Sequence, residues 1–179
     1  MLASLTACSP DPIPDHAVLF SGAPFGTNQD PEQAAIAVGS WAAASPGRTA
    51  NNPVLGARTA AAVDYLAGDL YANPRWQWVD PLIKIQLLQG REQMRAALGI
   101  LPNAPSQQVV DSLLSVASAQ LVGNGPAVYT SLRSPVFGRG PEQTYASLVN
   151  LPPLPLADVA LQRLNDSLNR SDRNCYPCG

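Results

Sequence analysis

Charged side chains are scarce in this chain of 179 residues, of which 13% are charged and only Lys84 is a lysine. Globular proteins average about 25% charged residues, so this surface has to rely on uncharged polar side chains. Lysine and arginine together number 11 against 13 aspartates and glutamates, and no basic cluster occurs along the chain. Because nucleic acids bind to clustered basic side chains, we expect no nucleic-acid partner.

Histidine is almost absent as well, since His16 is the only one. A Ser-His-Asp relay or a multi-histidine metal site is therefore not expected. The acidic residues Asp30 and Asp80 each precede a proline, at positions where a carboxylate caps a helix. No glycine-rich phosphate loop follows a strand-like segment. We predict no catalytic residues, no metal site and no cofactor, which favours a non-enzymatic protein.

Long apolar runs are also missing, because no stretch approaches the roughly 18 to 20 apolar residues that cross a bilayer. Near the N-terminus, however, Leu5-Thr6-Ala7-Cys8 resembles the lipobox of bacterial lipoproteins. The resemblance implies cleavage before Cys8, a lipid on Cys8 and attachment to a membrane of the bacterial cell envelope, facing the periplasm. The residues that follow include Pro10, Pro12 and Pro14, and they would form a polar, extended tether.

The residues before Cys8 do not complete a secretory signal. Such a signal has a basic region and about 7 to 15 apolar residues, whereas the seven residues before Cys8 include no lysine or arginine. Either the natural start lies upstream of Met1, or the motif is accidental and residues 1–14 are an ordinary tail.

Proline and glycine are plentiful, with 18 and 13 residues, and they divide the chain into helical segments. We expect an all-α fold, an irregular bundle or array of six to seven helices joined by Pro/Gly-rich turns. A single helical domain would cover residues 15–170, and a tail would cover 171–179. Capping residues, prolines and apolar periodicity together predict helices at 31–44, 53–72, 81–101, 106–122, 126–132, 141–149 and 156–169.

The clearest helical pattern covers residues 80–101, and we expect the other helices to pack around it. Its apolar residues Ile83, Leu87, Met94 and Leu98 fall on one stripe of a helix. Gly90 lies on the same stripe. A glycine costs a helix about 1 kcal/mol relative to alanine, so Gly90 predicts a close crossing by a neighbouring helix.

Two of the three tryptophans, Trp76 and Trp78, fall in the connector before this helix. Large aromatic side chains near helix ends usually fill the core, and we expect these two to do so. The alternative is a helical carrier of a small apolar ligand, with a pocket lined by Trp41, Tyr71, Trp76 and Trp78.

A pair of cysteines stands near the C-terminus, in Cys175-Tyr176-Pro177-Cys178. In an oxidising compartment this spacing predicts a local disulfide between Cys175 and Cys178. Structural zinc would need more cysteine or histidine ligands than the chain offers. A thiol-disulfide redox role is an alternative, although a C-terminal tail lacks the helix N-terminus that lowers the pKa of reactive thiols in thioredoxin-like enzymes.

Taken together, these features predict a non-enzymatic cell-envelope lipoprotein with a structural or binding role. It would be attached to the membrane through Cys8 and would bind an envelope protein partner. The alternatives are a thiol-disulfide redox protein using Cys175 and Cys178 and the helical carrier of a small apolar ligand.

Overall fold

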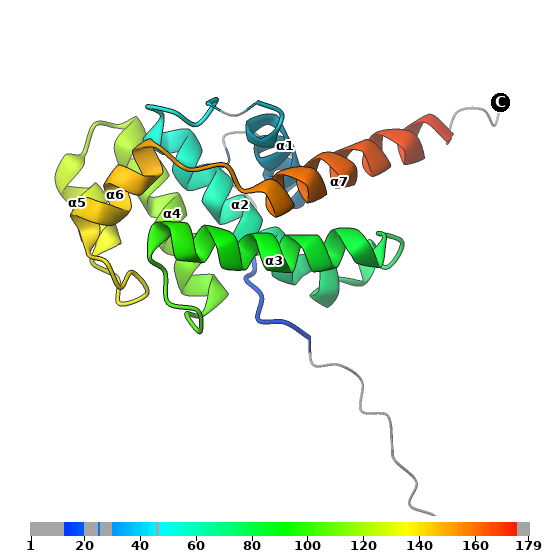
Figure 1. The fold of residues 1–179 in the computed structure, drawn as a ribbon, viewed down its shortest axis with the longest axis horizontal. Coiled ribbons are helices and arrows are strands. Elements are labelled where there is room, and N and C mark those ends of the chain that lie inside the picture. Colours follow the sequence, from blue (N-terminus) through cyan, green and yellow to red (C-terminus); the bar gives the residue numbers. More distant parts are fainter. Residues whose placement is uncertain (1–12, 20–24, 26–29, 46, 175–179) are drawn as a thin grey trace, which may run out of the picture.

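The computed structural model describes residues 13–19, 25, 30–45 and 47–174, which form an all-helical domain (Figure 1). Apart from an isolated bridge between Ile100 and Phe137, these residues contain no β-structure. The expected all-α fold of six to seven helices is confirmed. The elements are α1 (Pro31–Ala43), α2 (Pro53–Ala72), the short 3-10 helix η1 (Pro74–Trp76), α3 (Pro81–Leu98), α4 (Ser106–Leu121), α5 (Gly125–Leu132), α6 (Pro141–Val149) and α7 (Pro155–Asn174).

Three of the helices begin as their capping residues predict. The side chains of Asp30, Asn52 and Asp80 each accept a hydrogen bond from a backbone N–H of the first turn, at 2.8 to 3.0 Å. Each is followed by a proline, which needs no hydrogen-bond partner at that position. The last helix differs from the prediction because it continues to Asn174 instead of ending near Asn169.

The centre of the domain is α2, and the expectation that the segment 80–101 would hold this place is wrong. Fourteen of the twenty residues of α2 are buried, against six of eighteen in α3. Helices α1, α3, α4 and α6 all pack against α2. A helix that is buried on every side has no polar face and so no clear stripe, whereas a half-exposed helix such as α3 shows a clear apolar stripe.

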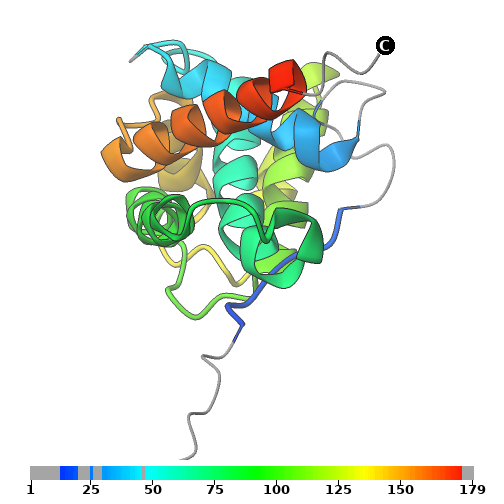
Figure 2. The ribbon, with the colours of Figure 1, turned by 90° about the vertical axis from the view of Figure 1, so that its right-hand side faces the viewer.

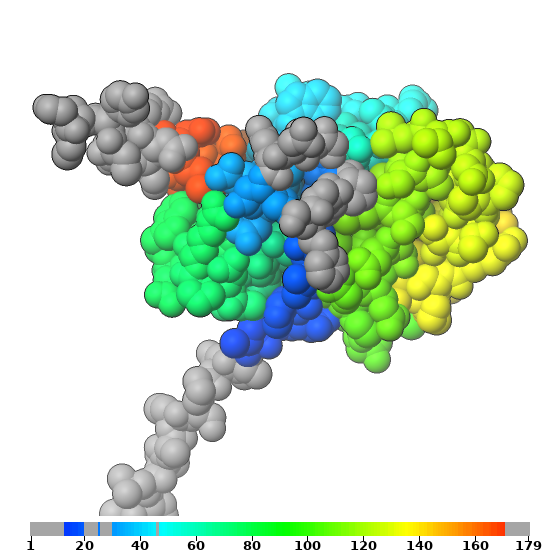
Figure 3. All heavy atoms as spheres, turned by 180° about the vertical axis from the view of Figure 1, so that it is seen from behind, coloured from blue at the N-terminus to red at the C-terminus, as the bar shows by residue number. Residues whose placement is uncertain are grey.

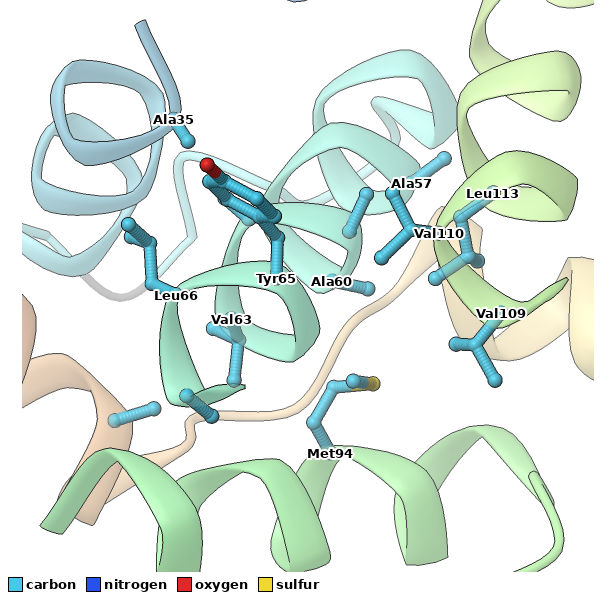
Figure 4. Close-up of a cluster of buried hydrophobic side chains, with 14 of the residues drawn as sticks. Ala35, Ala57, Ala60, Val63, Tyr65, Leu66, Met94, Val109, Val110 and Leu113 are labelled. Carbon is cyan, nitrogen blue, oxygen red and sulfur yellow. The ribbon is translucent and has the colours of Figure 1, made fainter. Parts of the chain in front are cut away.

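Small side chains let the neighbouring helices approach α2 closely. Its middle carries the run Ala60, Ala61 and Ala62, all fully buried. Figure 4 shows side chains of the neighbours converging on this helix, among them Met94 from α3 and Val110 from α4. The core is therefore a set of tight helix contacts centred on α2.

The last helix, α7, lies across α1 and α3 (Figure 2). A Cβ built on Gly90 of α3 would lie 2.6 Å from the Cβ of Ala157, in the first turn of α7. The close crossing that Gly90 predicts is therefore confirmed, and its partner is α7. The stripe of α3 is also confirmed, since its four apolar residues Ile83, Leu87, Met94 and Leu98 are all buried.

The apolar periodicity of residues 106–122 predicts that Leu121 faces inward, and the irregular segment 15–29 offers Val18 and Phe25 as anchors to the core. Leu121 and Val18 do not face inward. Leu121, expected on the apolar face of the fourth helix, is exposed because it lies in the last turn of α4, beyond the packed part of the helix. Val18, expected to anchor the N-terminal segment, exposes its side chain and attaches through its backbone. Phe25, another expected anchor, is buried as predicted.

Candidate functional site

A cluster of polar side chains marks the corner at which α2 ends and η1 begins. Asp69, in the last turn of α2, is 7% exposed and accepts a hydrogen bond from Nε1 of Trp76 at 2.8 Å. Asn73 ends α2, and its side chain accepts from the backbone N–H of Arg75, which turns the chain into η1. This turn folds the fully buried Trp76 back over the carboxylate of Asp69.

Two carboxyl groups in this corner have perturbed acidity. Burial raises the pKa of Asp69, although the hydrogen bonds from Trp76, Tyr65 and Asn73 partly offset this effect. Burial also raises the pKa of Glu32 in α1, and the nearby charge of Asp69 raises it further. Both groups are hydrogen-bonded to protein side chains, so the cluster holds α1, α2 and η1 together and does not form an open acid-base pair.

Arg75 covers this corner from the solvent side. Its guanidinium forms ion pairs with Asp30 at 2.6 Å and with Glu32 at 2.9 Å. Its guanidinium carbon also lies 5.0 Å from the ring centroid of Trp76, within the range of a cation–π contact. Arg75 therefore joins the start of α1 to the η1 turn.

An exposed apolar strip begins next to this corner. Trp78 packs beside Trp76 with ring centroids 6.1 Å apart, yet it is 48% exposed. Leu82 and Ile85, which follow at helical spacing on α3, are 49% and 47% exposed. We call Trp78, Leu82 and Ile85 the α3 strip. Leu82 and Ile85 lie about one turn apart on α3, and Trp78 lies in the connector before it. Large exposed apolar side chains that gather on a surface are a feature that binding sites share.

The N-terminal segment 13–19 is fastened to the first turn of α4. Asp15 accepts a hydrogen bond through Oδ2 from the backbone N–H of Ser106 at 2.6 Å, which satisfies a free N–H of the helix start. The side chain of Gln107 accepts from the backbone N–H of Val18 at 2.8 Å. Figure 3 shows this segment lying between the surface of α4 and that of the η1–α3 region. No pattern in the sequence predicted this attachment.

A buried ion pair lies behind that segment, and the sequence did not predict this pair either. Arg95 of α3 and Asp64 of α2 form two hydrogen bonds, at 2.7 and 2.9 Å, and both side chains are buried. Arg95 also donates to the backbone carbonyls of Pro102 and Ala104 and to Oγ of Ser106. An aspartate inside an apolar helix such as 53–72 was the signal that could have revealed it, because a buried charge requires a partner.

The four aromatic residues proposed to line a ligand pocket have different surroundings. Trp76 and Trp78 pack together, whereas Trp41 lies under the guanidinium of Arg48 and Tyr71 under the ammonium of Lys84. Three hollows among the described residues are lined by residues other than these four. Trp76 fills the core as expected, but the expectation that Trp78 does so is wrong, since its ring is half-exposed. The apolar carrier stays a prediction.

The three cysteines, Cys8, Cys175 and Cys178, lie outside the described residues. Lipidation of Cys8 and the terminal disulfide therefore stay predictions. Within the described residues, no three histidine, cysteine, aspartate or glutamate side chains gather as a metal site would require. In the same ranges, no helix is both long enough and apolar enough to cross a bilayer.

Comparison of the chain with protein-family models, with curated proteins and with solved structures found no match.

Proposed function

We propose that this protein is a non-enzymatic lipoprotein of the bacterial cell envelope, attached to a membrane through a lipid on Cys8. The observation that carries the proposal is the attachment of residues 13–19 to the folded body by Asp15 and Gln107. Only four residues separate Cys8 from Ile13, and the distance from Cys8 to Ile13 is at most about 18 Å when the chain is fully extended. A lipid on Cys8 would therefore hold the helical domain close to the bilayer surface.

With a lipid on Cys8, this short link would also select the face of the domain that meets the membrane. Figures 1 and 2 show residues 13–19 leaving the body below α3, and the backbone carbonyl of Asp15 accepts a hydrogen bond from Arg91 in the middle of that helix. Ile13 is exposed at that exit, and the α3 strip lies on the N-terminal part of the same helix and in the connector before it. Tryptophan favours the interface between lipid headgroups and water because its ring is apolar and its N–H is polar. We propose that the bilayer is the surface that the α3 strip contacts.

The attachment is tested by membrane fractionation after expression from a precursor with a complete signal peptide. The parent protein is expected in the membrane fraction, where salt does not release it but detergent does. The Cys8→Ser variant is expected in the soluble periplasmic fraction. Cys175→Ser is the matched control and should stay in the membrane. A parent protein that is soluble with a free Cys8 thiol would refute the proposal.

The orientation is tested separately, with Cys8 as the only remaining thiol. The Cys175→Ser, Cys178→Ser variant is coupled through Cys8 to vesicles that contain a maleimide-bearing lipid. In a Trp41→Phe background, emission should shift to shorter wavelength on coupling and acrylamide quenching should fall, because Trp78 enters the interface. In a Trp78→Phe background, Trp41 should show neither change. Equal responses of the two tryptophans would contradict the orientation and leave the attachment untouched.

A further inference from the structure

Residues 13–19 lie on the folded body with little buried side-chain surface. Ala17 is the only buried residue of these seven, and its side chain is a single methyl group. Pro14 and Leu19 are half-buried, and the other four residues are exposed. Because the hydrophobic contribution scales with the apolar area removed from water, packing holds this segment only weakly.

Hydrogen bonds at the surface provide much of the remaining attachment. Arg91 of α3 donates to the backbone carbonyl of Asp15 at 2.7 Å. The side chain of Gln107 in α4 binds both backbone groups of Val18, accepting from its N–H at 2.8 Å and donating to its carbonyl at 3.3 Å. Water competes for groups at the surface, so each such bond contributes little net free energy. A pull on the chain from its N-terminal side would reach these contacts one after another.

Asp15 also acts as a cap for α4. Pro105, which precedes this helix, provides no side-chain cap, and Asp15 accepts the backbone N–H of Ser106 instead, at 2.6 Å. Ser106 is fully buried, and its Oγ accepts a hydrogen bond from Arg95. Detachment of residues 13–19 would leave the N–H of Ser106 without its partner. Exchange of this N–H with solvent therefore reports whether the segment is attached.

Gly68 of α2 leaves the space in which the segment lies. A Cβ built on Gly68 would lie 2.6 Å from the carbonyl oxygen of Asp15 and 2.7 Å from Cα of His16. Helix α2 packs against four other helices, whereas the segment is held by surface contacts, so the segment is the part that would move. Alanine also favours a helix more than glycine does. Gly68→Ala should therefore detach the segment without unfolding the domain.

The first point of attachment along the chain determines the reach of the tether, a step that rests on the proposed lipid on Cys8. With residues 13–19 attached, the chain from Cys8 to Ile13 spans at most about 18 Å. With them detached, the next buried residue that the structure describes is Phe25. It lies 17 positions after Cys8, which corresponds to at most about 60 Å of extended chain. Detachment would therefore roughly triple the reach of the domain.

We propose that residues 13–19 form a detachable strap that regulates how far the domain stands from the membrane. The attached strap holds the α3 strip against the bilayer. When the strap detaches, the longer tether lets the domain leave the bilayer surface while Cys8 stays in it. Segments with few buried contacts open locally at a free energy below that of global unfolding. Tension along the tether, exerted by a partner bound to the domain, favours the detached state because that state is longer.

The first test is amide hydrogen exchange of the full-length, unlipidated protein in increasing urea. The N–H groups of Val18 and Ser106 should exchange through a local opening that depends little on urea, because detaching the strap exposes little surface. Leu66, fully buried in α2, should exchange only on global unfolding, with a steep urea dependence. The same free energy of opening and the same urea dependence at all three residues would overturn the proposal.

Gly68→Ala tests the contact between the strap and α2. The substitution should speed exchange of the Val18 and Ser106 N–H groups by about tenfold or more, as overpacking of this kind does, and should not speed exchange of Leu66. Gly125→Ala is the matched control and should change none of the three rates, since a Cβ there meets nothing within 4 Å. Unchanged exchange at Val18, or equal acceleration at Leu66, would contradict a strap that detaches by itself.

The effect on reach is measured on vesicles, with the Trp41→Phe protein coupled through Cys8 as in the orientation experiment. Gly68→Ala should stay bound to the vesicles but lose the shift of Trp78 emission to shorter wavelength. An undiminished shift would overturn the control of reach by the strap. The exchange experiments use no lipid, so a protein without lipid on Cys8 would refute the proposed function and leave the exchange rates as they are.

Discussion

At the scale of single residues, Asp69 and Glu32 are carboxyl groups whose surroundings disfavour the ionised form. Burial is the main cause at both positions, and it raises their pKa values. Their neighbour Asp30 behaves in the opposite way, because the hydrogen bond from Arg75 lowers its pKa. The same corner thus contains carboxyl groups whose protonation affects stability with opposite signs.

We expect Asp69→Asn to reduce the pH dependence of stability. A carboxyl whose pKa is raised on folding disfavours the native state when it is ionised, at pH values above its folded pKa. This cost disappears as the pH falls through that pKa toward the unfolded value. Relative to the variant, the parent protein should therefore gain stability as the pH falls from neutral toward the ordinary aspartate pKa of about 4.

Urea unfolding of both proteins across this pH range measures the effect. The amide introduced by Asp69→Asn still offers an oxygen to Nε1 of Trp76, so the variant should fold. Parallel pH profiles for parent and variant would show that ionisation of Asp69 carries no cost.

At the scale of elements, glycines mark where helices approach most closely. Gly90 of α3 meets the backbone of Ala157 in α7, and Gly56 of α2 meets the backbone of Leu148 in α6. Gly68 of α2 meets the backbone of residues 15 and 16. At each contact a side chain would meet backbone atoms, which cannot move aside as a flexible side chain can. The spacing of these helices thus depends on the absence of a Cβ.

We expect Gly90→Ala to destabilise the protein by about 1–3 kcal/mol, because the new Cβ overpacks the α3–α7 contact. In an isolated helix the same substitution would stabilise by about 1 kcal/mol. Gly125→Ala, at the start of α5, is the matched control, since a Cβ there meets nothing within 4 Å. Chemical denaturation compares the two variants with the parent. Stabilisation by both substitutions would contradict the close contact.

At the scale of the whole molecule, Arg95 joins parts of the chain that are distant in sequence. Its guanidinium binds Asp64 of α2, Ser106 of α4 and the turn between α3 and α4. Ser106 in turn donates its backbone N–H to Asp15. One buried network therefore connects three helices with the segment that leads to the proposed membrane anchor.

We expect Arg95→Met to destabilise the protein by about 3–5 kcal/mol, because it leaves the carboxylate of Asp64 buried without its partner. The double variant Arg95→Met, Asp64→Leu should lose less of the free energy of unfolding, because it removes both buried charges. Arg75→Met is the matched control: its ion pair with Asp30 is exposed, with side chains 40% and 37% accessible, so its loss should cost about 1 kcal/mol or less. Urea denaturation of the four proteins provides the comparison. If Arg95→Met and Arg75→Met lowered the free energy of unfolding equally, the buried network would contribute no more to stability than an exposed ion pair.

The candidate site could be predicted only in part. The sequence singled out Trp76 and Trp78 as aromatic residues that pack at the start of the central segment. It did not predict that Trp76 is buried and Trp78 half-exposed, because that difference depends on which ring turns toward Asp69. Asp64 and Arg95 are 31 residues apart, and a pairing at that distance has no local pattern. The same holds for Asp15 and Ser106, which are 91 residues apart.

The sequence by itself determined the helices, because caps such as Asp80, prolines and apolar spacing act within a few residues of one another. It also determined that α3 has a buried stripe with a close crossing at Gly90. Only the tertiary structure decided that α2 is the central helix, that α7 is the partner of Gly90, and that Asp15 fastens the N-terminal segment to α4. These contacts join residues far apart in the chain, and the free energy of such contacts depends on how complete surfaces fit together.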